Sequence, residues 1–269
     1  MSNLKMYCVT NKKLKFLENT KLILAGVGKE KFSNKYLRCD TRDNIFYKEK
    51  HYSELTFHYW YWKNLLQDEK NYWVGFCQKR RFWLKNIKIK NKSKINQNNI
   101  NDFILREVPN KFKSFESFIC KPIKVSGAKK IKIIKKGWRN LIKDPQLLIY
   151  PETISFHFDM HHGYKNLEKA IRLLDQNDED DFRNYVNTKN LFNPHIMCIA
   201  RPHILEKWFS ELFSWLNRCE TEFGFKNLEG YRTQRLYAYL AERYLSYWFK
   251  KYTKYTILPI QFKSLDDFL

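Results

Sequence analysis

Two adjacent arginines follow a short apolar run in the first third of the chain. Residues 72–77 (YWVGFC) are continuously apolar and have the length of a buried strand. The run ends abruptly in Gln78, Lys79, Arg80 and Arg81. Arginine presents a planar fork of hydrogen-bond donors that matches the oxygens of a phosphate group. Polar and cationic side chains at the carboxyl end of a buried strand are typical of a ligand site in an α/β protein.

A second group of reactive side chains comprises His157, Asp159, His161 and His162. Such a group invites interpretation as a metal site. A zinc site, however, needs ligands at defined spacings with a closing pair elsewhere, and the chain has no H-E-x-x-H motif. The spacing therefore predicts no metal centre at this group.

The composition limits the class of protein. The chain has 269 residues, of which 43% are hydrophobic and 17% aromatic, so it can bury a large core. The 6 cysteines are scattered and form no C-x-x-C pair, which favours a reduced cytoplasmic location over a disulfide scaffold or a zinc ribbon. No run of 18 apolar residues is present, and the first residues lack the apolar core of a signal peptide.

The charge balance is strongly basic. The 50 Lys and Arg residues exceed the 28 Asp and Glu residues and give a formal net charge of +22. Such a charge is typical of proteins that bind nucleic acid, an anionic membrane surface or phosphorylated substrates. The alternative is codon bias, because many lysines occur together with Asn and Ile, as in the low-complexity residues 85–102.

The apolar patterns predict an α/β fold with a mainly helical C-terminal third. Residues 5–10 and 22–25 have the pattern of short buried strands, and residues 52–66 that of a helix buried nearly all round. Pro202 begins a helix with a long apolar face, and residues 236–248 predict the last helix.

The middle of the chain has the pattern of an irregular insertion. We expect a single domain over residues 1–269, with a basic, irregular insertion around 84–150, where several prolines fall. Part of this insertion predicts a positive surface, for which a solvated face is the alternative. The cations of that part are Lys129, Lys130, Lys132, Lys135, Lys136 and Arg139.

Residues 43–64 (DNIFYKEKHYSELTFHYWYWKN) and 72–83 (YWVGFCQKRRFW) together resemble one bacterial family. They are similar to the capsular polysaccharide and O-antigen glycosyltransferases long described as a domain of unknown function. The pattern of that family is roughly N-I-S-x-K-N-x-x-Y-x-E-L-T-x-x-Y-W-x-W-K-N, followed by H-Y-R-R. The matching residues are Asp43, Asn44, Ile45, Lys48, Tyr52, Glu54, Leu55, Thr56, Tyr59, Trp60, Trp62, Lys63, Asn64, Gly75, Arg80, Arg81 and Phe82.

The chain departs from the family pattern at several positions. Phe46 and Glu49 replace a Ser and an Asn, and Ile196 replaces another Asn. Gln78 and Lys79 replace the His-Tyr pair ahead of the two arginines. Glutamine can hydrogen-bond a ligand but cannot shuttle a proton, so a proton-transfer role of the family's histidine does not carry over to Gln78.

The resemblance implies a GT-A-like nucleotide-sugar-binding domain that moves a sugar from a nucleotide-diphosphate donor, in the first place a UDP-sugar, to a surface-glycan acceptor. Many such enzymes hold a divalent metal with Asp-x-Asp at the end of a central strand, and here that place carries no carboxylate. We therefore expect Gln78, Arg80 and Arg81 to contact the donor, the arginines to neutralise the leaving diphosphate, and no divalent metal to take part. The alternative is that the arginines pair with core carboxylates such as Glu54 or Glu242.

Thr10, Asp43 and Asn44 complete the expected donor-binding set. Thr10 ends the first predicted strand, and Asp43 and Asn44 precede the buried helix. Asp and Asn also favour turns and helix starts, which is the alternative interpretation. The resemblance favours contact with the ribose or with hydroxyls of the donor sugar.

Asp159 and His162 are the candidates for the catalytic base that deprotonates the acceptor hydroxyl. His162 matches a histidine of the resembled family, and a surface loop is the alternative for both residues. His195 follows Asn193 and Pro194 and is a further site candidate, although a hydrogen-bonded core histidine is the favoured interpretation.

Two classes of function remain after this comparison. The first is a glycosyltransferase whose partners are a nucleotide sugar, a glycan or lipid-linked glycan acceptor and an anionic membrane surface at the inner face of the cytoplasmic membrane. The second is a nucleic-acid-binding protein that uses its basic surface and its aromatic residues. Most of the aromatics fall at buried helical spacing and no RNP, KH or zinc-finger pattern is present, so nucleic acid is not expected as a partner.

Overall fold

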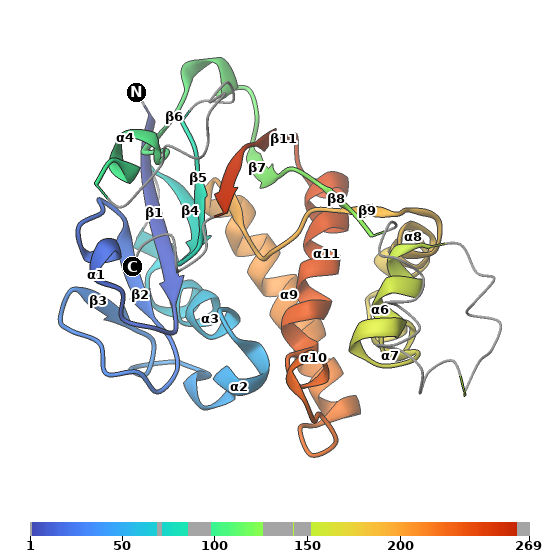
Figure 1. The fold of residues 1–269 in the computed structure, drawn as a ribbon. Coiled ribbons are helices and arrows are strands. Elements are labelled where there is room, and N and C mark those ends of the chain that lie inside the picture. Colours follow the sequence, from blue (N-terminus) through green and yellow to red (C-terminus); the bar gives the residue numbers. More distant parts are fainter. Residues whose placement is uncertain (1, 69–71, 86–97, 126–141, 143–151, 263–269) are drawn as a thin grey trace. The chain divides into compact units, whose positions relative to one another are not determined.

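The computed structural model describes residues 2–68, 72–85, 98–125, 142 and 152–262 (Figure 1). The chain divides into two compact units. Unit 1 comprises Met1–Lys121, Ile196–Ser210 and Phe249–Leu269, and unit 2 comprises Pro122–His195 and Glu211–Trp248. The basic segment 129–139 and most of the low-complexity segment 85–102 lie outside the described residues.

Unit 1 contains a mixed β-sheet whose strand order along the main path is β11-β7-β10-β4-β1-β2-β3. β4, β1, β2 and β3 run parallel to one another, whereas β10 is antiparallel to both β4 and β7. Three short strands join at the margins: β5 pairs with β4 and β12, and β6 pairs with β1. The strands are β1 (Ser2–Thr10), β2 (Ile23–Gly26), β3 (Tyr36–Arg38), β4 (Trp73–Gln78), β5 (Arg81–Trp83), β6 (Glu107–Val108), β7 (Ser117–Cys120), β10 (Cys198–Ala200), β11 (Tyr255–Leu258) and β12 (Ile260–Phe262).

Side chains alternate between the two faces of the central strand β1. Tyr7 packs on α3 (Leu55–Asn64), with its ring centroid 5.7 Å from that of Phe57 and 4.9 Å from that of Tyr61. Its neighbours Met6 and Cys8 belong to a separate apolar cluster, which also holds side chains from α1 (Lys15–Glu18), β5 and α4 (Ile100–Phe103). The sheet is therefore covered by apolar side chains on both faces, as the continuous apolar sequence of β4 predicts.

The helix predicted over residues 52–66 is interrupted near its start. Its first turn belongs to α2 (Glu49–Tyr52), which follows the short 3-10 helix η1 (Phe46–Lys48), and α3 begins at Leu55. Between them Ser53 takes a φ of 53°, a left-handed conformation that no helix interior allows. Glu54 follows this break and directly precedes α3.

Unit 2 is mainly helical. It contains α6 (Ile154–His162), α7 (Asn166–Ile171), α8 (Gln176–Thr188), α10 (Tyr231–Gln234) and the two-stranded pair of β8 (Ile123–Lys124) with β9 (Leu191–Phe192). The long helices α9 (Pro202–Phe223) and α11 (Leu236–Tyr252) each contribute residues to both units. α9 begins at Pro202 and ends before Gly224, whose φ of 56° suits a helix terminus.

The predicted α/β class with a mainly helical C-terminal third is confirmed by this arrangement. The sequence places residues 117–120 inside an irregular insertion, whereas the structure shows them as β7, fully buried between β10 and β11. The sequence SFIC is too short to reveal this strand, and its position is fixed by pairing with distant segments. Among the helices of the described residues, none is long and apolar enough to cross a bilayer.

Candidate functional site

The carboxyl ends of β4, β1 and β2 meet at one edge of the sheet in unit 1. Val9 lies opposite Gln78 and Thr10 lies opposite Gly26 in the parallel register. The chain adds β2 and β3 on one side of β1 and then returns to add β4 on the other side, so the strand order reverses at β1. An α/β sheet binds its ligands at the carboxyl ends of the strands beside such a reversal.

Thr10 shapes the backbone at this edge. Its buried hydroxyl donates to the Lys12 carbonyl oxygen (2.7 Å) and accepts from the Lys12 amide nitrogen (3.1 Å), while its own carbonyl accepts from the Val27 amide (2.9 Å). The turn after β1 is therefore fixed against the turn after β2. The Thr10 hydroxyl already serves this turn, so the structure gives Thr10 a local structural role at the expected edge.

Gln78 links Arg81 to a carboxylate. The Arg81 Nη1 donates to Gln78 Oε1 (2.9 Å), and Gln78 Nε2 donates to Glu54 Oε1 (2.5 Å). Gln78 and Arg81 also face each other as the last pair of the β4–β5 hairpin. Arg81 is thus linked to the Glu54 carboxylate indirectly, through the Gln78 carboxamide, and Glu54 joins the group of polar residues at the strand ends.

Lys79 and Arg80 form the turn of this hairpin. The Lys79 ammonium donates to the Asn11 side-chain oxygen, and the Lys79 amide donates to the Val9 carbonyl (3.2 Å). The guanidinium carbons of Arg80 and Arg81 lie 5.5 and 5.3 Å from the centroid of the half-exposed Phe262 ring of β12. Three half-buried cations are therefore held within one turn of chain, where a bound anion would relieve their mutual repulsion.

Asp43 and Asn44 lie in the loop before η1. The Asp43 carboxylate is exposed and accepts from the Tyr59 hydroxyl (3.2 Å); burial, together with this carboxylate, raises the pKa of Tyr59 to about 12. The Asn44 Oδ1 accepts from the Phe46 amide (3.1 Å), and its Nδ2 donates to the Arg42 carbonyl (2.8 Å). These bonds form a turn at Asn44, whereas the Asp43 carboxylate keeps access to solvent.

Asp159 and His162 lie on α6 in unit 2, whereas the strand-end group belongs to unit 1. His162 is 6% exposed, stacks on Tyr239 with ring centroids 3.8 Å apart, and has Nδ1 2.9 Å from the Arg232 carbonyl oxygen. A carbonyl oxygen only accepts, so Nδ1 carries the proton. Burial, and then the nearby Arg243 charge, hold the pKa of His162 well below its usual range, which makes His162 a weak base near neutral pH.

Asp159 occupies a different setting on the same helix. Its side chain is half-buried, and its Oδ1 accepts from the Lys165 amide (3.1 Å). It lines a cavity between α6, α7 and α8, to which His162 does not contribute. Of the two candidates for the base, the geometry favours Asp159.

His195 and Glu242 belong to a buried polar group in unit 2. The Glu242 carboxylate accepts from the His195 amide (2.5 Å) and from the Arg243 guanidinium. Burial lowers the pKa of Arg243, which is 1% exposed and lies over the Phe192 ring at 3.7 Å. The sequence names Glu242 as a partner for the strand-end arginines, whereas the structure pairs it with Arg243. The His195 Nδ1 also lies 3.8 Å from Glu242 Oε1, and the His195 backbone has a φ of 66°.

Metal-binding groups are absent from the part of the chain that the structure describes: no three His, Cys, Asp or Glu side chains there are arranged to hold an ion. Asp40, the nearest carboxylate to the end of β3, is paired with Arg38 at 2.7 Å. The independence of donor binding from metal remains a prediction.

Unit 1 is thus an α/β sheet with polar and cationic side chains at the carboxyl ends of its parallel strands. A family model described as a domain of unknown function (DUF4422) matches residues 5–254. The chain belongs to this family. No curated protein matches the chain.

A solved structure shares the fold. The apo structure of the bifunctional glycosyltransferase WbbM matches 98% of this chain with a TM-score of 0.71 and 20% sequence identity. This chain covers 46% of that chain, so it spans less than half the length of WbbM. At this identity the likeness shows the fold.

Proposed function

We propose that the chain is a glycosyltransferase that binds a nucleotide-diphosphate sugar at the carboxyl ends of β1, β2 and β4 and transfers the sugar to a surface-glycan acceptor. The observation that carries the proposal is the turn that holds Lys79, Arg80 and Arg81 beside the reversal of strand order. Membership of the family and the fold shared with a bifunctional glycosyltransferase support it.

The arginines would bind and neutralise the diphosphate. When the bond between the sugar and the diphosphate breaks, negative charge develops on the leaving phosphate oxygens, and fixed cations in a partly desolvated site stabilise that charge. The bond from Arg81 to Gln78, and from Gln78 to Glu54, keeps the Arg81 guanidinium oriented before the donor arrives. Glu54 is in this account a positioning residue.

We assign deprotonation of the acceptor hydroxyl to Asp159. It carries a carboxylate on the wall of a cavity, whereas His162 is buried, stacked on Tyr239 and a weak base.

The test is calorimetric titration of UDP, with and without EDTA, into the parent protein and into Arg80→Ala and Arg81→Ala. We expect UDP to bind in both buffers, and at least one variant to lose about 1.5–3 kcal/mol of binding free energy, which is roughly a 10- to 150-fold weaker Kd. Arg172→Ala is the matched control, because Arg172 lies in unit 2 with a side chain 69% exposed. If both strand-end variants fold and bind UDP as tightly as the parent, the arginine assignment is wrong.

A further inference from the structure

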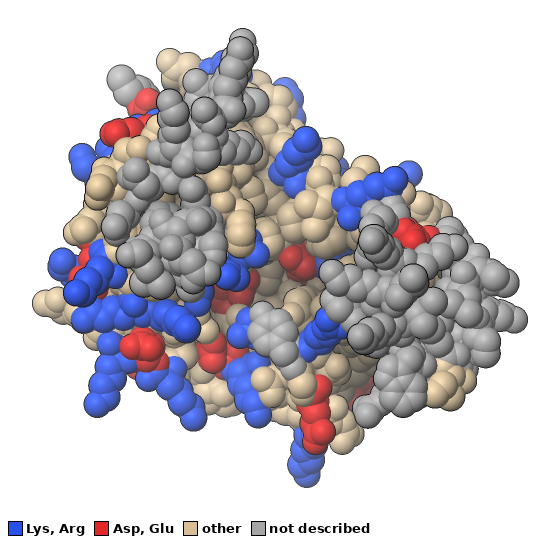
Figure 2. Space-filling model, in the orientation of Figure 1, with Lys and Arg blue, Asp and Glu red and all other residues tan. Residues whose placement is uncertain are grey.

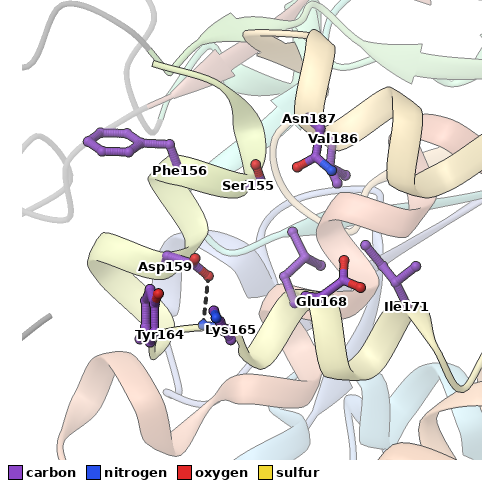
Figure 3. A pocket seen from close by; sticks show the side chains of 10 residues that line it. Ser155, Phe156, Asp159, Tyr164, Lys165, Glu168, Ile171, Val186 and Asn187 are labelled. Carbon is purple, nitrogen blue, oxygen red and sulfur yellow. Dashed lines mark hydrogen bonds between the residues drawn. The ribbon is translucent and has the colours of Figure 1, made fainter. Parts of the chain in front are cut away.

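A cavity of about 300 Å³ lies in unit 2 between α6, α7 and α8 (Figure 3). Its volume falls at the lower end of the range for small-ligand sites, roughly 300–1,000 Å³. Its accessible apolar lining comes from the half-buried Phe156 and Tyr164, whereas Leu167, Ile171 and Val186 are fully buried beneath it. Polar side chains from all three helices share the lining: Ser155, Asp159, Glu168 and Asn187.

The polar groups approach the cavity from separate directions. Figure 3 shows the carboxylates of Asp159 and Glu168 on opposite sides, with the Ser155 hydroxyl and the Asn187 carboxamide along another edge. The exposed Asn187 carboxamide hydrogen-bonds to no described residue, so both its donors and its acceptor are available to a ligand. The cavity thus offers hydrogen-bond donors and acceptors beside the half-buried ring of Tyr164.

The corner between α6 and α7 fixes one side of the cavity. Lys165 is left-handed, with a φ of 58°, and its amide donates to Asp159 Oδ1 (3.1 Å). Gly163 has a φ of 106°, and a Cβ there would meet Asn166 Nδ2 at 2.2 Å. The Asn166 side chain donates in turn to the His162 carbonyl (3.0 Å). This corner holds Tyr164 and Lys165 at the cavity before any ligand binds.

The charges around the cavity are balanced. Glu168 forms ion pairs with Arg172 (3.2 Å) and Arg183 (3.3 Å), and the Lys165 cation lines the same cavity as the Asp159 carboxylate, with its Nζ 5.2 Å from the centroid of the Tyr164 ring. Two carboxylates without these cations would favour a cationic ligand. With them, the site suits a neutral molecule that carries both hydrogen-bond donors and acceptors.

We propose that this cavity binds one ring of a neutral saccharide. A pyranose has apolar C–H faces that match the half-buried Tyr164 ring, and hydroxyl groups that both donate and accept, which match the carboxylates and the Asn187 carboxamide. Its identification as the acceptor subsite rests on the proposed function, and it places a sugar hydroxyl beside Asp159. Its identification as a saccharide site stands without the proposed function.

The test is saturation-transfer NMR with the methyl glycosides of galactose, glucose, mannose and N-acetylglucosamine, followed by titration of those that bind. We expect at least one glycoside to bind with ring protons in contact. Asn187→Leu should raise the Kd for that glycoside about tenfold, because the apolar replacement removes its hydrogen bonds to the ligand. Asn184→Leu is the matched control, because Asn184 is exposed on the same helix outside the cavity, and it should bind as the parent does.

A second pair of variants keeps the side-chain shape. Glu168→Gln removes a carboxylate of the cavity wall, whereas Glu179→Gln removes another carboxylate bound to Arg183 outside it. Only Glu168→Gln should weaken binding of the glycoside. The saccharide site is wrong if no glycoside binds to folded protein, if ethanolamine binds in their place, or if binding is insensitive to both Asn187→Leu and Glu168→Gln. UDP titration of the same samples separates this result from the donor proposal, because cavity variants should bind UDP as the parent does.

Discussion

Single residues show how burial decides what a titratable group can do in this protein. His58 on α3 is 2% exposed, and its ring centroid lies 4.5 Å from that of Phe76 and 5.9 Å from that of Phe209. Its Nδ1 has no hydrogen-bond partner among the described residues. Burial lowers the pKa of His58 from 6.5 to about 3, so the folded protein holds this histidine neutral.

The His58 setting predicts a pH dependence of stability. Between pH 6.5 and pH 3 the unfolded chain binds a proton at His58 that the folded chain does not, so the free energy of unfolding falls as the pH is lowered through this window. One such group contributes about 1.4 kcal/mol per pH unit well below its unfolded pKa. His58→Phe should reduce the slope of the free energy of unfolding against pH by roughly this amount. The slope is measured by urea unfolding at several values from pH 7 to pH 4.5.

The control for this experiment is the same substitution at an exposed histidine. His203→Phe, on α9, should leave the dependence of stability on pH as it is in the parent. An unchanged slope in His58→Phe would show that the imidazole is not held neutral by the core. His157, whose pKa is also lowered to about 3 by burial and by Arg243, and His162, whose pKa burial likewise lowers, would then be the main sources of any remaining slope.

The residue types in the sequence predict where charged side chains cluster, but they do not predict which residues those side chains contact. The apolar run 72–77 followed by cations locates the strand end directly from the sequence, and β4 ends at Gln78 as this pattern predicts. The partnership of Gln78 with Glu54 spans 24 positions and depends on the break at Ser53, for which the sequence carries no signal. The cavity residues Glu168 and Asn187 escaped prediction for the same reason, because three helices must pack before they share a wall.

Some strands of the sheet take their place by pairing with segments that are distant in the sequence, and the pattern of apolar residues does not predict such pairing. The sequence predicts the strands over residues 5–10 and 22–25 from composition, and both are present as β1 and β2. It does not predict β7, which is short and acquires its place only by pairing with β10 and β11. Local pattern therefore identifies the strands that lead unit 1, while long-range pairing completes the sheet.

Gly26, the last residue of β2, lies directly against the ring of Phe32. A Cβ at Gly26 would lie 2.5 Å from Cδ2 of the Phe32 ring, which is closer than side-chain atoms approach one another. A rigid ring can relieve this overlap only by moving away from its site. Gly26→Ala should therefore destabilise the protein by about 1–3 kcal/mol, measured by urea unfolding.

A double-mutant cycle identifies the cause. In a Phe32→Ala background the ring is gone, so the additional cost of Gly26→Ala should fall to near zero. If Gly26→Ala lowers the free energy of unfolding equally in the parent and in Phe32→Ala, Gly26 is required for a reason other than its contact with Phe32.

The molecule as a whole carries a net charge of +22, and the structure shows where part of it lies. Figure 2 shows Lys and Arg side chains gathered over the part of unit 1 that contains β3 and α2. Exposed cations of this surface include Lys29, Lys31, Lys35, Arg42 and Lys50. The sequence predicts a positive surface at residues 129–139, and those residues lie outside the described part of the chain.

This basic surface predicts salt-dependent binding to an anionic membrane. Each cation near a negatively charged leaflet contributes about 1 kcal/mol, and the attraction weakens as salt screens it. The protein should float with vesicles that contain phosphatidylserine at low salt, and less at physiological salt. Neutral vesicles are the lipid control, and replacing Lys29, Lys31 and Lys35 by Gln should reduce recovery.

Two outcomes would contradict the membrane prediction. Equal recovery with neutral and anionic vesicles would leave codon bias as the explanation of the charge. Tight binding of single-stranded DNA or RNA that falls steeply with salt would favour the nucleic-acid alternative instead.

We expect the diphosphate of a nucleotide sugar to bind beside the Lys79–Arg81 turn without a metal ion, and a crystal structure of the protein with UDP and Mn²⁺ would show where it binds. The diphosphate should lie at the carboxyl ends of β1 and β4, within hydrogen-bond distance of the guanidinium of Arg80 or Arg81, with no ion coordinated to it. An Mn²⁺ ion that bridges the diphosphate to the carboxylate of Asp40, Asp43 or Asp159, or a diphosphate bound away from this turn, would show that this mode of binding is wrong.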